Sequence, residues 1–248
     1  MAENKKVIVS DLDGTLTESK SLISSEMAEV ICQLLSKHFL AVVSGGSYNQ
    51  YQKQFLSGLS CGEDKLKNLF LFPTNGSTCY LYENDNWKQV YNEPLGDEER
   101  KNIISVLKEA IKETGLDLSG AYGEVIEDRG SQITFSGCGQ EAPVDEKKKW
   151  DPGGIKRQAI VLILKKRIPQ FEIRINSTSS IDITRWGIDK AYAIAKIKKL
   201  LNVTDDDIIF VGDALYKGGN DSAIKKTGID FIQESGPDQT IEFLGQYL

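Results

Sequence analysis

Histidine, cysteine and long apolar runs are scarce in this sequence, and each shortage narrows the functions open to it. The single histidine, His38, has no second base or metal-binding partner, so we expect a structural role for it. No apolar run approaches the ~20 residues of a membrane span, and the first residues contain no secretory apolar segment. The four cysteines lack metal-site spacing and predict reduced thiols in a cytoplasmic protein: Cys32, Cys61, Cys79 and Cys138.

The sequence also has fewer basic than acidic residues. The 248 residues contain 30 Lys and Arg against 36 Asp and Glu, which gives a net charge of −6. This balance argues against nucleic acid as a partner through bulk charge, and together with the missing apolar run it predicts no membrane partner. With 40% hydrophobic and 27% charged residues, the composition indicates a soluble globular protein of one or two domains.

Short β-branched and aromatic runs alternate with helical patterns at both ends of the chain. Strands that alternate with helices predict a parallel α/β sheet. The runs that we expect to be buried strands are 7–10, 39–43, 69–72 and 207–211, and the expected helices include 48–56 and 190–201. The fold class is therefore α/β, with a Rossmann-like parallel-sheet core formed by residues 1–82 and 187–248.

The middle of the chain has a different pattern, which predicts an inserted domain over residues 83–186. Long helical segments are expected at 97–114 and 152–167, with Asp151 as a plausible helix cap. The segments 132–135, 171–175 and 180–183 alternate like half-exposed strands. An antiparallel sheet with helices on one face fits this α+β stretch.

Two aspartates directly after the first strand are the strongest chemical signal. The run Asp-Leu-Asp-Gly-Thr-Leu-Thr spans residues 11–17, and in open α/β sheets ligands gather beyond the carboxyl ends of the strands. Gly14 lets the chain turn away sharply. One carboxylate of the Asp11 and Asp13 pair can attack an electrophile while the other transfers protons.

A second signal follows the strand at 39–43, where Ser44, Gly45, Gly46 and Ser47 form a small-residue turn. Backbone N–H groups and hydroxyls in such a turn can cradle a phosphate. The alternative is an ordinary strand-to-helix turn with Ser47 as the helix cap.

Further along the chain, a cation and two more acids complete the pattern. Lys190 opens the expected helix at 190–201; it is either a solvated charge or a group that holds a phosphoryl group against Asp11. Asp213 follows the strand at 207–211, and Asp221 ends the same loop. Acids crowded at one sheet edge repel one another, and a hard cation such as Mg²⁺ relieves that repulsion.

Taken in this order, these motifs resemble those of the haloacid dehalogenase (HAD) superfamily, and the insert is similar to its type IIB cap. Within the superfamily the resemblance is to eukaryotic-type phosphomannomutases. They share the Gly-Gly-Ser turn, a Phe-Pro-x-Asn-Gly segment (72–76), the Gly-Asp…Gly-Gly-Asn-Asp loop (212–221) and a cap Ser-x-Asp (180–182).

The resemblance implies a role for each matching position. Asp11 would be the nucleophile that forms an aspartyl-phosphate, and Asp13 the general acid and base. Mg²⁺ would be held by Asp11, the Asp13 backbone carbonyl and Asp213, with Asp221 direct or through water. Ser44, Gly45 or Ser47 would bind the transferring phosphoryl group together with Lys190. The substrate-binding positions would be Lys20, Asn75, Arg129, Ser180, Asp182 and Asn220.

The cap departs from the mutase pattern, in which several arginines hold phosphate at either end of a hexose bisphosphate. Two positions of the cap at which the family pattern has arginine differ here: Gln140 stands eleven residues after Arg129, and Lys147 stands at the next of these positions. Lys20 replaces a further arginine of the pattern. Lysine is a point charge and cannot reproduce the bidentate fork of arginine. Ser44 also resembles the phosphatase form of its motif. We therefore read the second phosphate clamp as weakened.

A weak clamp favours release of the dephosphorylated sugar, so we expect a sugar-phosphate phosphatase. Two alternatives remain open. One is a phosphomannomutase that interconverts mannose 1-phosphate and mannose 6-phosphate, and the other is a catalytically silent sugar-phosphate sensor. The expected partner is a phosphorylated sugar, and the expected state is a monomer or a cap-mediated homodimer.

Overall fold

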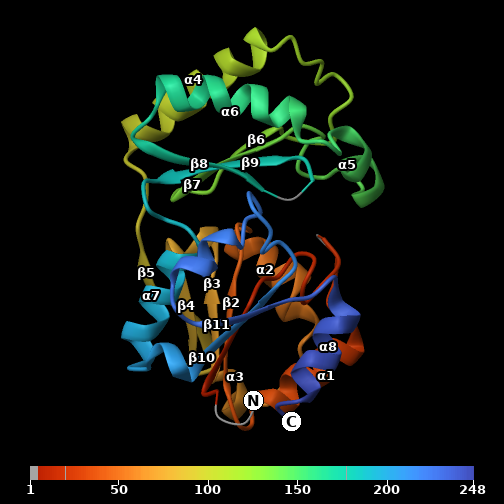
Figure 1. The fold of residues 1–248 in the computed structure, drawn as a ribbon, viewed down its shortest axis with the longest axis vertical. Helices are drawn as coiled ribbons and strands as arrows, with labels where there is room; N and C mark the ends of the chain where they lie inside the picture. Colours follow the sequence, from red (N-terminus) through yellow and green to blue (C-terminus); the bar gives the residue numbers. More distant parts are fainter. Residues whose placement is uncertain (1–4, 20, 177) are drawn as a thin grey trace. The chain divides into compact units, whose positions relative to one another are not determined.

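The computed structural model describes residues 5–19, 21–176 and 178–248, and the chain divides into two compact units. The first contains the residues up to Asn92 together with Asp189–Leu248, and the second is Glu93–Ile188 (Figure 1). The insert thus begins ten residues later than the position 83 expected from the sequence. The reason is that β5 (Asn86–Asn92), a polar strand, pairs with β4 (Thr78–Glu83) in the sheet of the first unit.

The first unit is built on a seven-stranded sheet in the order β11-β10-β1-β2-β3-β4-β5. Its first five strands are parallel, and β4 and β5 extend it in antiparallel fashion. The parallel strands are β1 (Val7–Ser10), β2 (Phe39–Val43), β3 (Leu69–Phe72), β10 (Ile208–Gly212) and β11 (Asp230–Gln233). The expected Rossmann-like α/β core is confirmed.

Both faces of this sheet are covered, which explains why its central strands are apolar at successive positions. Ile8 lies in a core cluster with residues of α1 (Ser25–Leu34) and α8 (Pro237–Gly245), whereas its neighbours Val7 and Val9 pack with residues of α7 (Lys190–Leu201). Figure 1 shows α7 on one side of the sheet and α1 and α8 on the other. Helix α2 (Tyr48–Gln54) contributes Tyr51 to the first cluster.

Short helices complete the first unit. They are α3 (Glu63–Leu66) and the 3-10 turns Leu56–Gly58, Thr74–Gly76, Asp205–Asp207 and Ser222–Lys226. Because β10, β1, β2 and β3 are adjacent and parallel, the loops that follow them gather at one edge of the sheet.

The second unit is a four-stranded antiparallel sheet in the order β6-β7-β9-β8 with helices packed on it. Isoleucines of the strands meet residues of α4 and α6 in one apolar cluster, so the sheet with helices on one face is as expected (Figure 1). Its elements are α4 (Asp97–Glu113), β6 (Ile126–Asp128), β7 (Gln132–Ser136), α5 (Val144–Trp150), α6 (Ile155–Arg167), β8 (Phe171–Asn176) and β9 (Ser180–Arg185).

Helix α6 begins at Ile155, three residues later than expected, although Asp151 does act at its start. The Asp151 carboxylate accepts hydrogen bonds from the backbone N–H groups of Lys156 and Arg157, each at 3.1 Å, and pairs with the Arg157 guanidinium at 2.9 Å. The left-handed Gly154 (φ 69°) lies between Asp151 and the first turn. The N-cap is therefore Gly154 rather than Asp151, and Asp151 satisfies N–H groups of the first turn from outside the helix.

Two cysteines are not the reduced thiols that the sequence predicted. Cys32 on α1 and Cys61, 29 residues later, form a disulfide, whereas Cys79 and Cys138 are free and buried. Their spacing carries no sign of this pairing, because the contact arises only when α1 packs beside the segment that follows α2.

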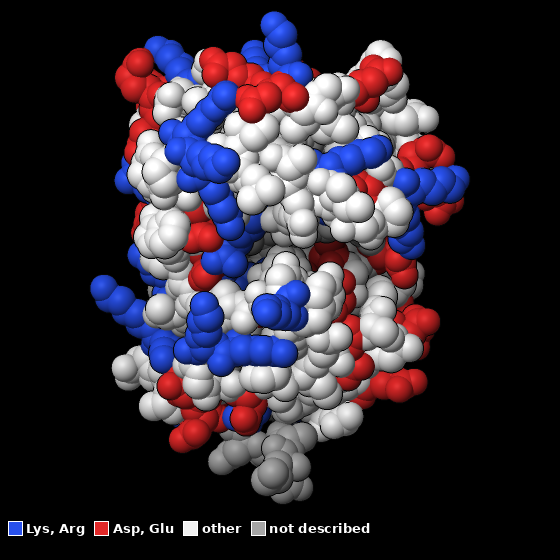
Figure 2. Space-filling model, turned by 45° about the horizontal axis from the view of Figure 1, so that its top comes forward, with Lys and Arg blue, Asp and Glu red and all other residues white. Residues whose placement is uncertain are grey.

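On the face drawn in Figure 2, acidic and basic side chains are mixed. Within the described ranges, none of the helices combines the length and the apolar character that crossing a bilayer requires.

Candidate active site

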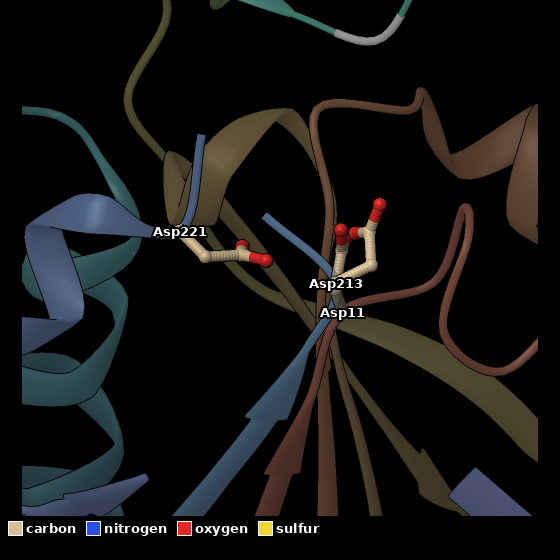
Figure 3. A group of neighbouring side chains, drawn as sticks. All are labelled: Asp11, Asp213 and Asp221. Atoms are coloured by element: carbon tan, nitrogen blue, oxygen red, sulfur yellow. The ribbon is translucent and has the colours of Figure 1, made fainter. Parts of the chain in front are cut away.

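Three aspartates meet at the carboxyl end of the core sheet. Asp11 follows β1 and Asp213 follows β10, and because these strands pair in parallel (Ser10 opposite Val211) the two residues emerge side by side. Asp221 returns from the end of the loop after β10. Carboxylate oxygens of the three lie within 4.8 Å of one another, and Figure 3 shows Asp221 pointing toward the other two.

Lys190, the first residue of α7, is buried among these acids. Its Nζ lies 2.7 Å from Asp11 Oδ1 and also pairs with Asp221, and the side chain has no exposed surface. A solvated surface lysine is therefore excluded. Burial by itself lowers the pKa of Lys190, but the two carboxylates outweigh it and raise the pKa above its ordinary value. Lys190 is a fixed cation.

Burial acts in the opposite direction on the pKa of Asp11 and Asp213. Burial raises the pKa of Asp11 well above its ordinary range; Lys190 opposes the rise, and Asp221 and Asp213 add to it. Burial, followed by the charge of Asp221, raises the pKa of Asp213 to about 6. One lysine thus leaves the three acids with surplus negative charge, which is the condition that a bound cation relieves.

The donor set fits a hard divalent cation. Mg²⁺ takes carboxylate oxygens at about 2.1 Å, so two ligands on one ion stand up to ~4.2 Å apart. The oxygens of the cluster, which lie within 4.8 Å of one another, need only small movements or one bridging water to reach that spacing. Both oxygens of Asp221 already have partners, Lys190 and the Ala214 N–H at 3.1 Å. By this criterion Asp213 is better placed for direct ligation than Asp221.

Two glycines make this crowding possible. Gly14 has φ 85°, and a Cβ there would lie 2.8 Å from Asp213 Oδ2. A Cβ on Gly212 would lie 2.4 Å from Asp221 Oδ2. Any larger residue at either position displaces an acid of the cluster.

Asp13 points elsewhere. Its Oδ1 accepts a hydrogen bond from Gln54 Nε2 at 2.8 Å, and its Oδ2 accepts one from Gln50 Nε2 at 3.2 Å. Both glutamines belong to α2. Reasoning from the sequence missed them, although their i, i+4 spacing on the helix after the serine turn was a signal that could have found them.

The serine turn has divided roles. Ser47 Oγ accepts from the Gln50 N–H at 3.4 Å and caps α2, so the alternative interpretation of this residue as a helix cap is correct. Ser44 Oγ accepts from the Gly46 N–H at 3.2 Å, and its carbonyl accepts from the Asn75 N–H at 2.9 Å. The turn that contains Gly45 and the segment of Asn75 are thus joined. Asn220 lies nearer the acids, with Nδ2 3.5 Å from Asp11 Oδ2.

The second unit contains the other expected substrate residues. Asp182 on β9 accepts from Thr134 Oγ1 at 2.9 Å and from Asn176 Nδ2 at 2.7 Å, and Ser180 lies two residues before it on the same face. Arg129 is paired with Glu127, its Nη2 at 2.6 Å and its Nε at 3.0 Å from Oε2.

Lys147, which stands where the family pattern has an arginine, is not a surface charge. Residues 146–149, which the sequence suggested to be a solvated loop, belong to α5, and Lys147 is buried with Nζ donating to the Gln140 carbonyl at 3.2 Å. A helix lets one residue of a charged run face inward while its neighbours face solvent. Lys20 lies outside the described residues.

Comparison with known proteins agrees with this architecture. The family model described as eukaryotic phosphomannomutase matches residues 27–246. The chain belongs to the eukaryotic phosphomannomutase family. Phosphomannomutase of Schizosaccharomyces pombe is 29% identical over 226 residues, covering 89% of this chain and 85% of that protein. Phosphomannomutase 2 of Dictyostelium discoideum is 27% identical, with coverage of 90% and 88%.

Solved structures show the same fold at lower identity. An IMP-nucleotidase of Plasmodium falciparum aligns with a TM-score of 0.74 at 19% identity, covering all of this chain and 71% of that one. A haloacid dehalogenase-like hydrolase from Bacteroides thetaiotaomicron aligns with a TM-score of 0.66 at 18% identity, with coverage of 98% and 100%. The phosphomannomutase family member described here thus shares the fold of a haloacid dehalogenase-like hydrolase. Its family membership supports an enzyme of phosphohexomutase or phosphohydrolase type.

Proposed function

We propose that this enzyme is a Mg²⁺-dependent phosphatase that hydrolyses a phosphorylated sugar through an aspartyl-phosphate on Asp11. The observation that carries the proposal is the contact of Asp11 with Lys190 (2.7 Å) inside a cluster of three acids, of which Asp11 and Asp221 are buried and Asp213 is partly buried. A buried nucleophile beside a fixed cation is suited to accept a phosphoryl group, whose oxygens the cation then neutralises.

The two oxygens of Asp11 have different surroundings. Oδ1 accepts from Lys190 Nζ and from the Leu12 N–H, both at 2.7 Å, whereas Oδ2 has only the long contact with Asn220 among the described residues. We assign attack on phosphorus to Oδ2. As the Oδ2–P bond forms and the P–O bond to the sugar breaks, Asp13 gives its proton to the leaving oxygen.

The second step reverses the proton transfer. The Asp13 carboxylate takes a proton from water as the water oxygen bonds to phosphorus, and the Oδ2–P bond breaks to restore Asp11. Lys190 holds phosphoryl oxygens in both steps, with Ser44 and Gly45 as further phosphate-binding candidates. Mg²⁺, when held by Asp11, the Asp13 backbone carbonyl and Asp213, supplies neutralisation of phosphoryl charge.

Hydrolysis is favoured over transfer back to a sugar because the cap's candidate cations are already engaged. Arg129 pairs with Glu127 in its own unit, and Lys147 donates to a backbone carbonyl. Groups bound in this way are poor clamps for the second phosphate of a hexose bisphosphate. Ser180 and Asp182 remain the proposed sugar-binding positions.

A phosphomannomutase is the second candidate, and family membership favours it. One product assay separates the two: mannose 1-phosphate is supplied with Mg²⁺ and a catalytic amount of hexose bisphosphate. The phosphatase releases inorganic phosphate as the main product, whereas mannose 6-phosphate as the main product contradicts our proposal.

A panel of phosphosugars, with Asp11→Asn as the inactive control, tests for catalysis as such. Turnover by the wild type that Asp11→Asn abolishes supports the enzyme. Binding without turnover across the panel would instead support a sugar-phosphate sensor.

A further inference from the structure

Two neutral amides hold the carboxylate of Asp13. Gln54 Nε2 donates to Asp13 Oδ1 at 2.8 Å and to Thr17 Oγ1 at 2.6 Å, so it links both ends of the turn that follows the nucleophile. Gln50 Nε2 donates to Asp13 Oδ2 at 3.2 Å and to Gln54 Oε1 at 3.0 Å. Each carboxylate oxygen of Asp13 therefore has its own N–H donor, and the two donors are connected.

This arrangement restrains the carboxylate in orientation as well as in place. A single donor leaves a carboxylate free to rotate about its Cβ–Cγ bond, whereas donors to both oxygens select one plane. Gln54 is itself 4% exposed, and Gln50 holds its amide in turn. Burial and the second amide leave few other rotamers for the Gln54 side chain.

We propose that Gln54, oriented by Gln50, is a positioning residue that aims the Asp13 carboxylate at the leaving-group oxygen. The inference rests on the proposed function, in which Asp13 protonates that oxygen as the bond to phosphorus breaks. Neither glutamine touches the phosphoryl group or the acid cluster in this proposal; they act through Asp13 alone.

A purely structural role would give a different result. If Gln54 only secured the turn at residues 13–17, its loss would disturb Asp11 together with Asp13 and slow every substrate alike. If it aims a general acid, its loss harms substrates in proportion to their need for a proton. A sugar alkoxide needs protonation in order to leave, whereas the nitrophenolate of p-nitrophenyl phosphate leaves without it.

The experiment compares kcat/KM of Gln54→Ala on these two kinds of substrate. kcat/KM reports the steps up to departure of the leaving group, so later hydrolysis of the aspartyl-phosphate does not mask the effect. The sugar phosphate used is the one that the wild type turns over fastest in the panel above. We expect a fall of about 10- to 100-fold on the sugar phosphate and less than about 3-fold on p-nitrophenyl phosphate, with saturating Mg²⁺.

Two variants of the same helix serve as controls. Gln52→Ala removes an exposed amide from α2 and should leave both values unchanged. Tyr51→Phe removes a hydroxyl that bonds to the Val42 and Phe72 carbonyls, so it loosens the attachment of the helix while both glutamine hydrogen bonds to Asp13 are kept. Its effect should be equal on both substrates.

An equal fall for Gln54→Ala on both substrates, or no fall, overturns the inference. If that variant does not fold, Gln50→Ala removes one donor instead. It should lower kcat/KM more for the sugar phosphate than for p-nitrophenyl phosphate, by a smaller factor than Gln54→Ala. Equal effects on the two substrates overturn the inference as well. A wild type without turnover of any phosphosugar instead defeats the proposed function, so the two failures are distinguishable.

Discussion

Replacing Lys190 with methionine removes the only cation that contacts the acid cluster within the described residues while keeping a side chain of similar length. Lys190 has no exposed side-chain surface, and it pairs with Asp11 and Asp221, which are buried as well. Taking away one partner of a buried ion pair leaves uncompensated charge and costs about 3–5 kcal/mol of stability. At roughly 2–4 °C per kcal/mol for a chain of this size, the midpoint of thermal unfolding should fall by roughly 6–20 °C in EDTA.

The same helix offers a matched control. Lys198 pairs with Asp205 at 2.7 Å, but the two side chains are 33% and 43% exposed. Lys198→Met should therefore cost less than about 1 kcal/mol. Mg²⁺ should recover part of the loss in Lys190→Met, because the cation compensates charge that the lysine no longer balances. The midpoint of thermal unfolding is measured for both variants in EDTA and in Mg²⁺. Equal falls of the midpoint for Lys190→Met and Lys198→Met would refute the reasoning.

Three further predictions concern the metal site and the disulfide. Gly14→Ala should raise the Mg²⁺ concentration for half-maximal activity by about tenfold or more, because its Cβ would meet Asp213 Oδ2 at 2.8 Å; Gly115→Ala, also at positive φ but with open space around it, should not. Because the pKa of Asp213 is raised to about 6, protons compete with the cation for this carboxylate below that pH. The Mg²⁺ concentration for half-maximal activity should therefore rise by up to about tenfold for each pH unit below about 6. A concentration that stays constant between about pH 5 and 6 contradicts this prediction. Reducing the disulfide, whose cysteines are 29 residues apart, should cost about 3–4 kcal/mol in denaturant unfolding, and Cys32→Ser should abolish the response to reductant.

The acid cluster could be predicted from the sequence because it depends only on strand ends. Asp11 and Asp213 each follow an apolar run, and adjacent parallel strands bring such residues together whatever the loops do. Lys190 was predictable as the start of a helix, but its burial was not, since only packing of α7 against the sheet determines it.

What the sequence did not reveal depends on contacts between side chains of separate elements. The Cys32–Cys61 disulfide and the contact of Gln54 with Asp13 join residues 29 and 41 positions apart. No local pattern marks the disulfide, and the i, i+4 spacing of Gln50 and Gln54 does not by itself show that they face Asp13. The segment 86–92 fell within the expected insert because the strand–helix alternation of the first domain stops near residue 83. It nevertheless pairs with β4 at the edge of the core sheet, where a strand needs no run of apolar residues.

The structure separates two chemically identical side chains that lie two residues apart. Asp11 continues the line of β1 into the buried cluster with Lys190, where charge governs it. Asp13, directly before the left-handed Gly14, instead accepts hydrogen bonds from the neutral amides of α2. A nucleophile benefits from a nearby cation that stabilises the transferred phosphoryl group, whereas a group that must gain and lose a proton is better served by neutral donors that fix its orientation. The proposed division of roles between Asp11 and Asp13 thus matches the difference in their surroundings, as in other sites where paired carboxylates act differently in one reaction.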